Sequence, residues 1–430
     1  HLLKVHLPYH ESDHVLNLAY NVLCGGTRLE DIERLRHDTA YMNALDAELI
    51  PDPTTAGDFT RRFDEDDVVQ LMECINAVRP PLWRTRARDL LGPVAYIDVD
   101  GTMAPTHGQQ KAGMDISHKG VWGYAPLIVS LANTKEVLYL VNRPGNATSH
   151  QGAAPWIDAA IDLVQPYAQR LCLRGDTDFS LTAHFDRWAE EADFIFGMDC
   201  NSALRTRAAA LEESAWQRLS RRPQYEAQTA QTRQRLQDNE KQRLVRERGF
   251  VKLELNFEDV AEFDYQPGKC HRPYRVVALR KNISKRQGAQ VLFDDIRYFF
   301  YITTRTDLSA AEVVFCANER CDQENVIEQL KNGVNALRLP VYDLLSNWAY
   351  MVIAALAWNI KSWFAMMMHR HNDRRQYIGM EFRTFVNRII LIPAQVVRRA
   401  RRTTLRIIGY QPALERLFNT WCAIERAGFS

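Results

Sequence analysis

The hydrophobic pattern in the middle of the chain predicts strands and helices in a fixed order. Short apolar runs typical of buried strands lie at 94–99, 126–132, 136–142, 170–173 and 194–198. Helical periodicity appears at 156–163, between the third and fourth runs, and at 181–191, between the fourth and fifth. Three strands, a helix, a strand, a helix and a strand are the order of a ribonuclease-H-like core. We therefore expect an α/β fold in which the first and fourth strands are neighbours.

The pattern changes on both sides of this core and once inside it. Residues 1–91 favour small helices with basic residues, which suit a DNA-binding or dimer region and equally a plain helical cap. The first part of the core would occupy 92–203, and a charged helical and β-rich insertion would follow over 204–312. The chain would return to the core at 313–338 with a last helix. We expect 339–430 to be a helical C-terminal region.

One apolar stretch, from Trp348 to Met368, is long enough to suggest a membrane span. It contains Asn359, Lys361 and Ser362, and basic, polar sequence follows it. These polar residues are more typical of a buried helix. We therefore expect no membrane partner.

Two acids lie at the end of the first predicted strand. Asp98 and Asp100 are two residues apart, so their side chains would point to the same face of the strand. Two neighbouring carboxylates repel each other unless a cation joins them, and Mg²⁺ prefers such oxygen ligands. The alternative is a turn in which Asp100 and Gly101 close a hairpin and Asp98 is solvated.

A second acid follows the fourth predicted strand. Asp176 comes directly after Arg174 and Gly175, and a glycine at this point allows a tight exit from the strand and close approach of a ligand. Asp178 is a weaker candidate ligand, because it could instead cap a helix that begins at Phe179 or Ser180.

A third segment combines one acid with two cations. In a helix over 317–332 that ends at Gly333, Arg320, Glu324 and Lys331 share one stripe. The alternative is a solvated stripe, whose ion pairs contribute only a few tenths of a kcal/mol. Three carboxylates from three distant elements, flanked by two cations, nevertheless favour a divalent-metal site that handles phosphate.

Net charge does not by itself indicate a nucleic-acid partner, because the chain carries only +1. Its cysteines form no C-x-x-C pair, so we expect no structural zinc. Local clusters leave two alternatives open. In a basic amphipathic stretch over 383–406, the arginines either line a phosphate backbone or form the wet face of a packed helix. Trp122 either stacks on a base or belongs to the core, the more frequent case. The residues concerned are Arg398, Arg399, Arg402, His118, Lys119 and Trp122.

Taken together, these segments resemble the DDE transposases of bacterial insertion sequences, in particular the insertion-sequence 1380 family within DDE group 1. The resemblance covers most of the chain. It is carried by the segments 9–16, 51–59, 98–102 and 174–179, and by a Tyr-x2-Arg-x3-Glu-x6-Lys signature. The tyrosine position of that signature is Ala317 here, so any contact of a tyrosine hydroxyl is missing.

The resemblance implies a site and a reaction. Asp100, Asp176 and Glu324 would hold two Mg²⁺ ions, which Mn²⁺ can replace, and Asp98 is a further candidate ligand. The enzyme would cut the ends of a transposon and join them to target DNA by a cut-and-paste route. The positively charged candidates for contact with DNA are Arg174, Arg320 and Lys331, together with the clusters named above.

The same resemblance implies the partners and the location. The partners would be double-stranded transposon ends and double-stranded target DNA, bound by a homodimer in a synaptic complex. The location would be the cytoplasm of a bacterium, at the nucleoid.

Two other functions fit part of the pattern. The segment 98–102 is similar to that of haloacid-dehalogenase-like phosphatases, in which Asp98 would be the nucleophile and Asp100 the general acid/base. Such enzymes need a later acidic pair on a doubly wound sheet, and the pairs at 66–67 and 294–295 fit poorly. The other alternative is an inactive, transposase-derived DNA-binding protein, against which the intact acids argue.

Overall fold

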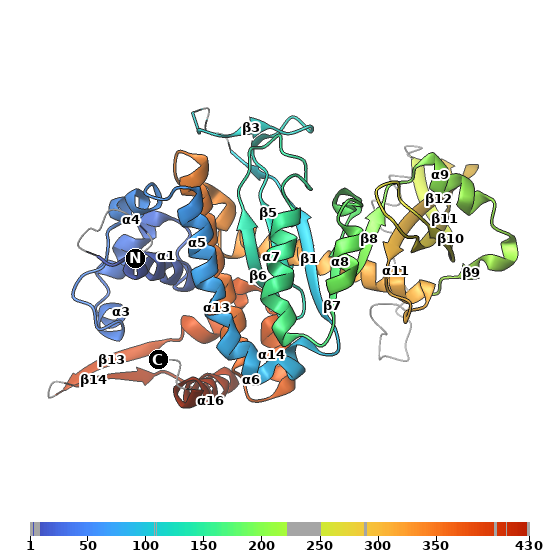
Figure 1. Cartoon of the computed structure of the whole chain (residues 1–430). Helices are drawn as coiled ribbons and strands as arrows, with labels where there is room; N and C mark the ends of the chain where they lie inside the picture. Colours follow the sequence, from blue (N-terminus) through green and yellow to red (C-terminus); the bar gives the residue numbers. More distant parts are fainter. Residues whose placement is uncertain are drawn as a thin grey trace. The chain divides into compact units, whose positions relative to one another are not determined.

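The computed structural model describes residues 3, 9–106, 108, 110–221, 251–287, 290–399, 402–409 and 411–427. The chain divides into two compact units (Figure 1). Unit 1 consists of His1–Leu173 and Arg320–Ser430, and unit 2 consists of Arg174–Glu319. Both are mixtures of helices and strands, so the fold is mixed α/β, as predicted.

Unit 1 begins with helices that have strong local start signals. The N-caps Asp52 and Asp64 accept hydrogen bonds from the backbone amides of Thr55 and Asp67 at 2.9 Å, which satisfies donors that the helix leaves free. The helices are α1 (Glu11–Leu23), α2 (Ile32–Arg36), α3 (Thr39–Ala44), α4 (Pro53–Thr60), α5 (Glu65–Asn76) and α6 (Arg79–Leu91).

The predicted strands of the core form a sheet in unit 1. In the order β6-β5-β1-β7, β1 lies beside β7, so the expected neighbours are confirmed. β5 is antiparallel to both β1 and β6. The strands are β1 (Ala95–Gly101), β5 (Leu127–Leu131), β6 (Glu136–Val141) and β7 (Leu171–Gly175), and helix α7 (Ala154–Val164) packs on the first three. β7 itself passes from unit 1 into unit 2 after Leu173.

The long apolar stretch forms the buried helix α13 (Leu344–Met366), which packs on α1, α5 and β6, as predicted. Two of its polar residues, Asn359 and Lys361, have internal partners. The amide of Asn359 donates to the carbonyl oxygen of Val137 at 3.0 Å and accepts from its N–H at 2.9 Å. Among the residues that the structure describes, no helix is long and apolar enough to span a membrane.

Unit 2 is rich in long antiparallel strands. The strand order is β8-β12-β11-β10-β9. The strands are β8 (Asp193–Met198), β9 (Gln217–Arg218), β10 (Val251–Tyr265), β11 (Tyr274–Gln287) and β12 (Gln290–Thr303), and the helices are α8 (Phe185–Glu191), α9 (Ser202–Ala209) and α11 (Ala310–Glu319). Most of the predicted charged helical stretch, residues 222–250, lies outside the described residues.

The C-terminal region of unit 1 differs from the prediction. In the part of the basic stretch that the structure describes, helical structure is limited to α15 (Phe382–Phe385) and the π-helical turn η7 (Val386–Ile390). An antiparallel hairpin of β13 (Ala394–Arg399) and β14 (Arg402–Ile407) follows. Pro393 cannot donate a helical hydrogen bond, and the β-branched pairs at 396–397 and 403–404 favour strands. Helices α14 (His371–Ile378) and α16 (Pro412–Ala427) flank this part.

Candidate active site

The first pair of predicted acids lies on β1, in the middle of the sheet of unit 1. Asp98 is opposite Ser130 and Asp100 is opposite Ile128 in the pairing of β1 with β5. Asp98 is completely buried, whereas the Asp100 side chain is 15% exposed. The alternative with a turn and a solvated Asp98 is therefore wrong, because β1 continues through Gly101.

Arg320 brings the third motif onto this strand. Its Nη1 donates to Oδ2 of Asp100 at 2.8 Å, and the exposed fraction of both side chains is 15%. The backbone N–H of Gly101 donates to the other carboxylate oxygen of Asp100 at 2.8 Å. Asp100 is thus fixed by one charged and one backbone donor, and charge-assisted bonds of this kind are the stronger ones.

The helix of the third motif is less regular than predicted. Arg320 separates α11 from α12 (Cys321–Glu328), which ends in the π-helical turn η5 (Gln329–Gly333). A single helix over 317–332 with Gly333 as its cap is therefore wrong. A π turn also changes the angular spacing between Glu324 and Lys331 that the predicted stripe assumed.

Glu324 and Lys331 nevertheless lie in the same unit as Asp100. Glu324 is exposed on α12, and Lys331 is half-buried in η5. Burial lowers the pKa of the Lys331 ammonium group, while the negative charges of Glu328 and Asp100 oppose that shift. Lys331 therefore senses the charge of Asp100.

Gln323 holds α12 against the sheet, and the sequence analysis missed it. Its side chain is buried and contacts β5, the neighbour of β1. Nothing in the sequence marks this residue, because its partner Ser130 lies 193 residues away.

Asp176 lies in unit 2, just after β7. Its carboxylate accepts a hydrogen bond from the N–H of Asp178 at 3.0 Å and caps the short 3₁₀ helix η3 (Thr177–Phe179). The predicted capping role of Asp178 is therefore wrong, because Asp176 performs it. Gly175 serves close packing: a Cβ there would lie 2.8 Å from Cβ of Phe179.

Arg174 is not on the surface. Its side chain is 3% exposed, and Nη1 donates to the carbonyl oxygen of Cys316 at 3.1 Å and lies 3.6 Å from Glu319. Within unit 2 it therefore ties the end of β7 to α11. Burial leaves no surface for the predicted contact with DNA.

The donor chemistry of these elements fits a hard divalent cation. Asp98, Asp100 and Glu324 offer carboxylate oxygens, the ligands that Mg²⁺ prefers. Within the parts of the chain that the structure describes, no three His, Cys, Asp or Glu side chains gather as a metal-binding group.

The predicted aromatic candidate lies on a small sheet of unit 1. Strands β2 (Ala104–Pro105), β3 (Asp115–Ile116) and β4 (Trp122–Tyr124) form it in the order β2-β4-β3. His118 and Lys119 are exposed in the β3–β4 connection, and Trp122 is 50% exposed, so a core tryptophan is wrong. Gly123, the next residue, allows β4 to lie close to β2, because a Cβ at this residue would be 2.2 Å from the carbonyl oxygen of Ala104.

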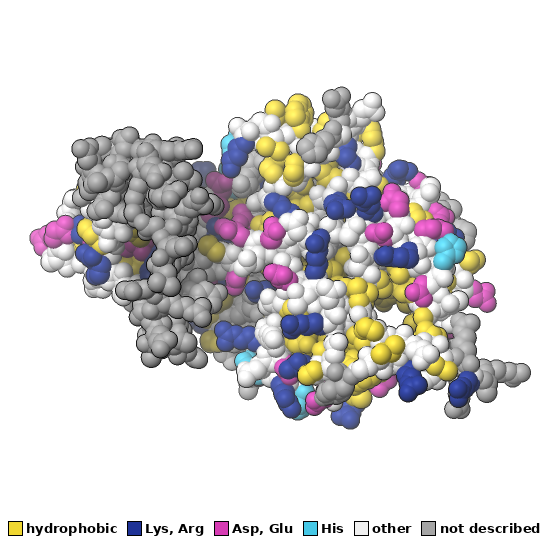
Figure 2. Space-filling model, turned by 180° about the vertical axis from the view of Figure 1, so that it is seen from behind, with side chains coloured by type: hydrophobic (Ala, Val, Ile, Leu, Met, Phe, Trp, Pro, Cys, Tyr) yellow, Lys and Arg dark blue, Asp and Glu magenta, His cyan; other side chains and the backbone are white. Residues whose placement is uncertain are grey.

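The arginines of the C-terminal region lie on the β13–β14 hairpin and not on a helix. Arg398 pairs with Thr403 and Arg399 with Arg402 in the register of the strands. Arg399 is exposed. Elsewhere, Figure 2 shows basic side chains scattered among acidic ones, in keeping with the small net charge.

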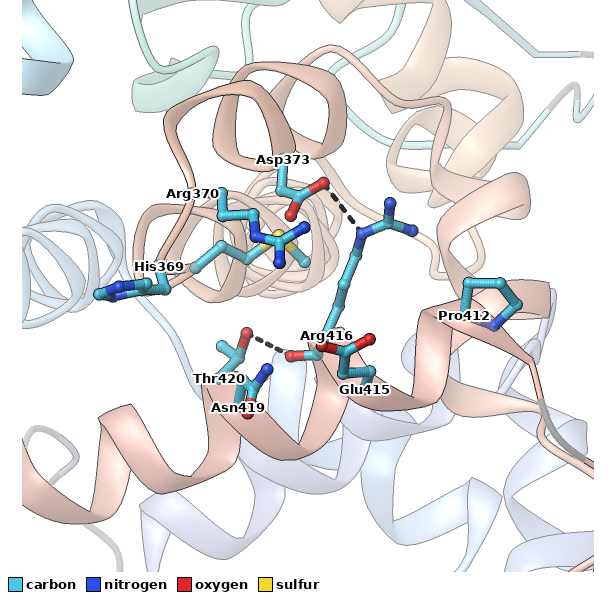
Figure 3. Close-up of a pocket in the computed structure, with 9 residues that line it drawn as sticks. His369, Arg370, Asp373, Pro412, Glu415, Arg416, Asn419 and Thr420 are labelled. Atoms are coloured by element: carbon cyan, nitrogen blue, oxygen red, sulfur yellow. Dashed lines mark hydrogen bonds and ion pairs between the residues drawn. The ribbon is translucent and has the colours of Figure 1, made fainter.

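A cavity of about 310 Å³ lies between α14 and α16 (Figure 3). Arg416 and Asp373 pair across it, with Nε 2.9 Å from Oδ1. The Thr420 hydroxyl donates to the carbonyl oxygen of Arg416. The predicted acids do not line this cavity.

Comparison with known proteins identifies the class. The family described as transposase DDE domain group 1 matches residues 5–428. The chain is thus a DDE transposase. Within that class it belongs to group 1.

No curated protein matches the chain in sequence. Seven chains of solved structures match. One is described as a piggyBac transposase synaptic complex with hairpin DNA, with a TM-score of 0.38 and 12% identity over 88% of this chain and 72% of that chain.

The phosphatase alternative does not fit. It requires a doubly wound parallel sheet around Asp98, whereas β1 is antiparallel to β5 and β5 is antiparallel to β6. Membership of the DDE transposases is a second reason to reject it.

Proposed function

We propose that the chain is a cut-and-paste transposase whose acids Asp100, Asp176 and Glu324 hold two Mg²⁺ ions. The observation that carries the proposal is the ion pair of Arg320 with Asp100, since it joins the glutamate-bearing motif to the strand of the first aspartate. Membership of the DDE transposases supports the reaction class. We choose Asp100 over Asp98 because only Asp100 has an exposed carboxylate surface.

Each residue would have a separate role. When bound, the metal ions would activate the attacking water or 3′-hydroxyl and stabilise the leaving oxygen. Arg320 orients the Asp100 carboxylate and, with Lys331, would position phosphates near the site. Lys331 supplies a second cation near Asp100. Burial lowers the pKa of Lys331, but the negative charge of Asp100 acts in the opposite direction and favours the protonated ammonium group.

Two surfaces of unit 1 would contact DNA. The exposed ring of Trp122 would stack on a base, with His118 and Lys119 near the phosphates. The hairpin with Arg398, Arg399 and Arg402 would follow the backbone, which provides affinity without sequence readout.

The setting follows from the resemblance seen in the sequence. We propose a bacterial insertion sequence of the 1380 family as the source, a ribonuclease-H-like catalytic core, and a homodimer that holds two transposon ends at the nucleoid. Mn²⁺ would also support the reaction in place of Mg²⁺.

The test uses labelled DNA that carries the ends of the element. Wild-type protein should cut at the ends with Mg²⁺ or Mn²⁺ and not with EDTA, and Glu324→Ala should bind the ends without cutting them. If the wild type binds ends but does not cut them in any metal, the chain is a DNA-binding protein derived from a transposase. Cleavage that survives in Asp176→Asn would remove Asp176 from the site.

A further inference from the structure

We propose that Gln323 is a positioning residue, which sets Glu324 relative to Asp100 by fastening α12 to β5. This inference rests on the proposed function, because it concerns the same metal-binding acids. Gln323 itself would touch neither metal nor DNA, since its side chain is buried between α12 and the sheet.

Both the oxygen and the nitrogen of the Gln323 side-chain amide form hydrogen bonds. The Ser130 hydroxyl donates to Oε1 of Gln323, and Nε2 of Gln323 donates to the carbonyl oxygen of Ile128 at 3.3 Å. Gln323 is 1% exposed and Ser130 is equally buried, so water does not compete for these bonds. Glutamine suits the position because its amide offers a donor and an acceptor at the same time.

The two partners of Gln323 are the residues opposite the acids. Ser130 faces Asp98 and Ile128 faces Asp100 across the pairing of β5 with β1. The amide therefore connects the glutamate helix to the part of β5 that is in register with both aspartates. Ser130, Ile128, Gln323 and both aspartates all lie in unit 1.

The helix needs such a fastening because both of its ends are irregular. α12 begins at the break formed by Arg320 and ends in the π turn η5, so no long, straight helix sets its direction. Its apolar residues Val326 and Ile327 are buried, but apolar contacts are not directional. Arg320 bonds to Asp100, and Gln323 bonds to β5. Asp322 adds a looser ion pair with Lys135, with 3.7 Å between Oδ1 and Nζ. Gln323 is the buried attachment, and together with Arg320 it fixes an orientation that a single contact would leave free to pivot.

The experiment compares four forms of the full chain: wild type, Gln323→Met, Ser130→Ala and Asn325→Ala. Methionine keeps the length and helix propensity of glutamine but removes both hydrogen bonds. Asn325 is exposed on the same helix and bonds only locally to Asp322, so its alanine variant is the matched control. Mn²⁺ binding is measured by electron paramagnetic resonance with and without end DNA, and cleavage is measured against Mg²⁺ concentration.

For Gln323→Met we expect Mn²⁺ affinity to fall by about 10–100-fold, the range for residues that orient ligands from behind. The Mg²⁺ concentration needed for half-maximal cleavage should rise in parallel, while affinity for end DNA stays within about twofold, because no group that contacts DNA is changed. Ser130→Ala removes one of the two bonds and should show a smaller change of the same sign. Asn325→Ala should match the wild type in both measurements.

The outcomes separate this inference from the proposed function. Unchanged Mn²⁺ affinity and Mg²⁺ dependence in Gln323→Met, with folding verified by circular dichroism, would overturn the positioning role even if the wild type cuts DNA. If Gln323→Met does not fold, Ser130→Ala decides, and wild-type metal dependence in that variant has the same meaning. If the wild type binds Mn²⁺ but cuts no DNA, the proposed reaction fails and the Mn²⁺ comparison still decides the role of Gln323. A wild type that binds no Mn²⁺ would reject both.

Discussion

Arg320 and Asp100, 220 residues apart in the chain, form an ion pair with 2.8 Å between Nη1 and Oδ2. Both side chains are only 15% exposed, so solvent screens the pair less than it screens a surface pair. The pair links the start of α12 to β1. Any change in Arg320 therefore affects the position of the helix as well as the charge beside Asp100.

Replacing Arg320 by glutamine should reduce end cleavage strongly. The charge-assisted bond to Asp100 is lost, and a displacement of about 1 Å in a catalytic group can cost about 100-fold in rate. Arg320→Lys keeps the positive charge but loses the planar guanidinium group. Its cleavage rate should therefore lie between those of the wild type and Arg320→Gln. The measurement is the single-turnover rate of end cleavage at saturating DNA and Mg²⁺. Equal rates for Arg320→Gln and for Asn325→Ala, a control at an exposed site on α12, would contradict this role.

Trp122→Ala should weaken binding of end DNA. Loss of one base stacked on an aromatic ring costs about 1–3 kcal/mol, so the Kd should rise by roughly 5- to 150-fold. Trp421 is the matched control, because it is 61% exposed but lies on α16. Fluorescence anisotropy with labelled ends measures both variants. If the two substitutions change the Kd equally, the small sheet has no special contact with DNA.

The hairpin arginines should govern the salt dependence of DNA binding. Each phosphate contact contributes about −0.9 to the slope of log K against log salt concentration, so changing Arg398, Arg399 and Arg402 together to glutamine should reduce the slope by up to about 3. Arg383 and Arg388, exposed just before the hairpin, provide a control double substitution to glutamine. Titrations at several salt concentrations measure the slope. An unchanged slope in the triple variant would place the phosphate contacts elsewhere.

His14 should make the protein less stable in mild acid. It is completely buried and stacks on Phe59 at 4.3 Å, and within the described residues neither ring nitrogen has a hydrogen-bond partner. Burial, helped by the charge of Arg62, lowers its pKa from 6.5 to about 4. Between these values the unfolded chain binds the proton and the folded chain does not. The free energy of unfolding therefore falls as pH drops from 6.5 to 4, by on the order of 2 kcal/mol.

His14→Phe keeps an aromatic ring against Phe59 and removes the titration. Urea unfolding at pH 7 and pH 5 should show a smaller loss of stability in this variant than in the wild type. Other acids titrate in both proteins, so the difference between them isolates His14. If the two proteins lose the same stability, the histidine is not protonated on unfolding in this range.

The parts of the fold that could be predicted are those set by local patterns. The apolar runs before Asp100 and before Asp176 indicated strands because alternation and length are properties of neighbouring residues. The stretch over 383–406 was wrongly predicted to be helical, because arginines among aliphatic residues also fit a helix. Pro393, directly before β13, was the signal against a continuous helix.

The sequence predicted which residues belong to the candidate site, but not how they contact one another. Asp100 and Arg320 were found because three motifs with acids occur in a particular order along the chain, but the contact between the two residues depends on packing between distant segments. The π turn that contains Lys331 leaves no local mark in the sequence. Gln323 was missed for the same physical reason, since its bonds to Ser130 and Ile128 exist only once α12 lies on β5.

Unit 1 is built from two segments of the chain with unit 2 between them. Its central helix, α13, belongs to the second segment and packs on α1, α5 and β6 of the first. During synthesis on the ribosome, those elements emerge long before α13 does. The core of unit 1 therefore stays open until translation has passed Met366, and the pairing of Arg320 with Asp100 also waits for the later segment. A chain that ends before Arg320 therefore lacks both the partner of Asp100 and the helix that closes the core of unit 1.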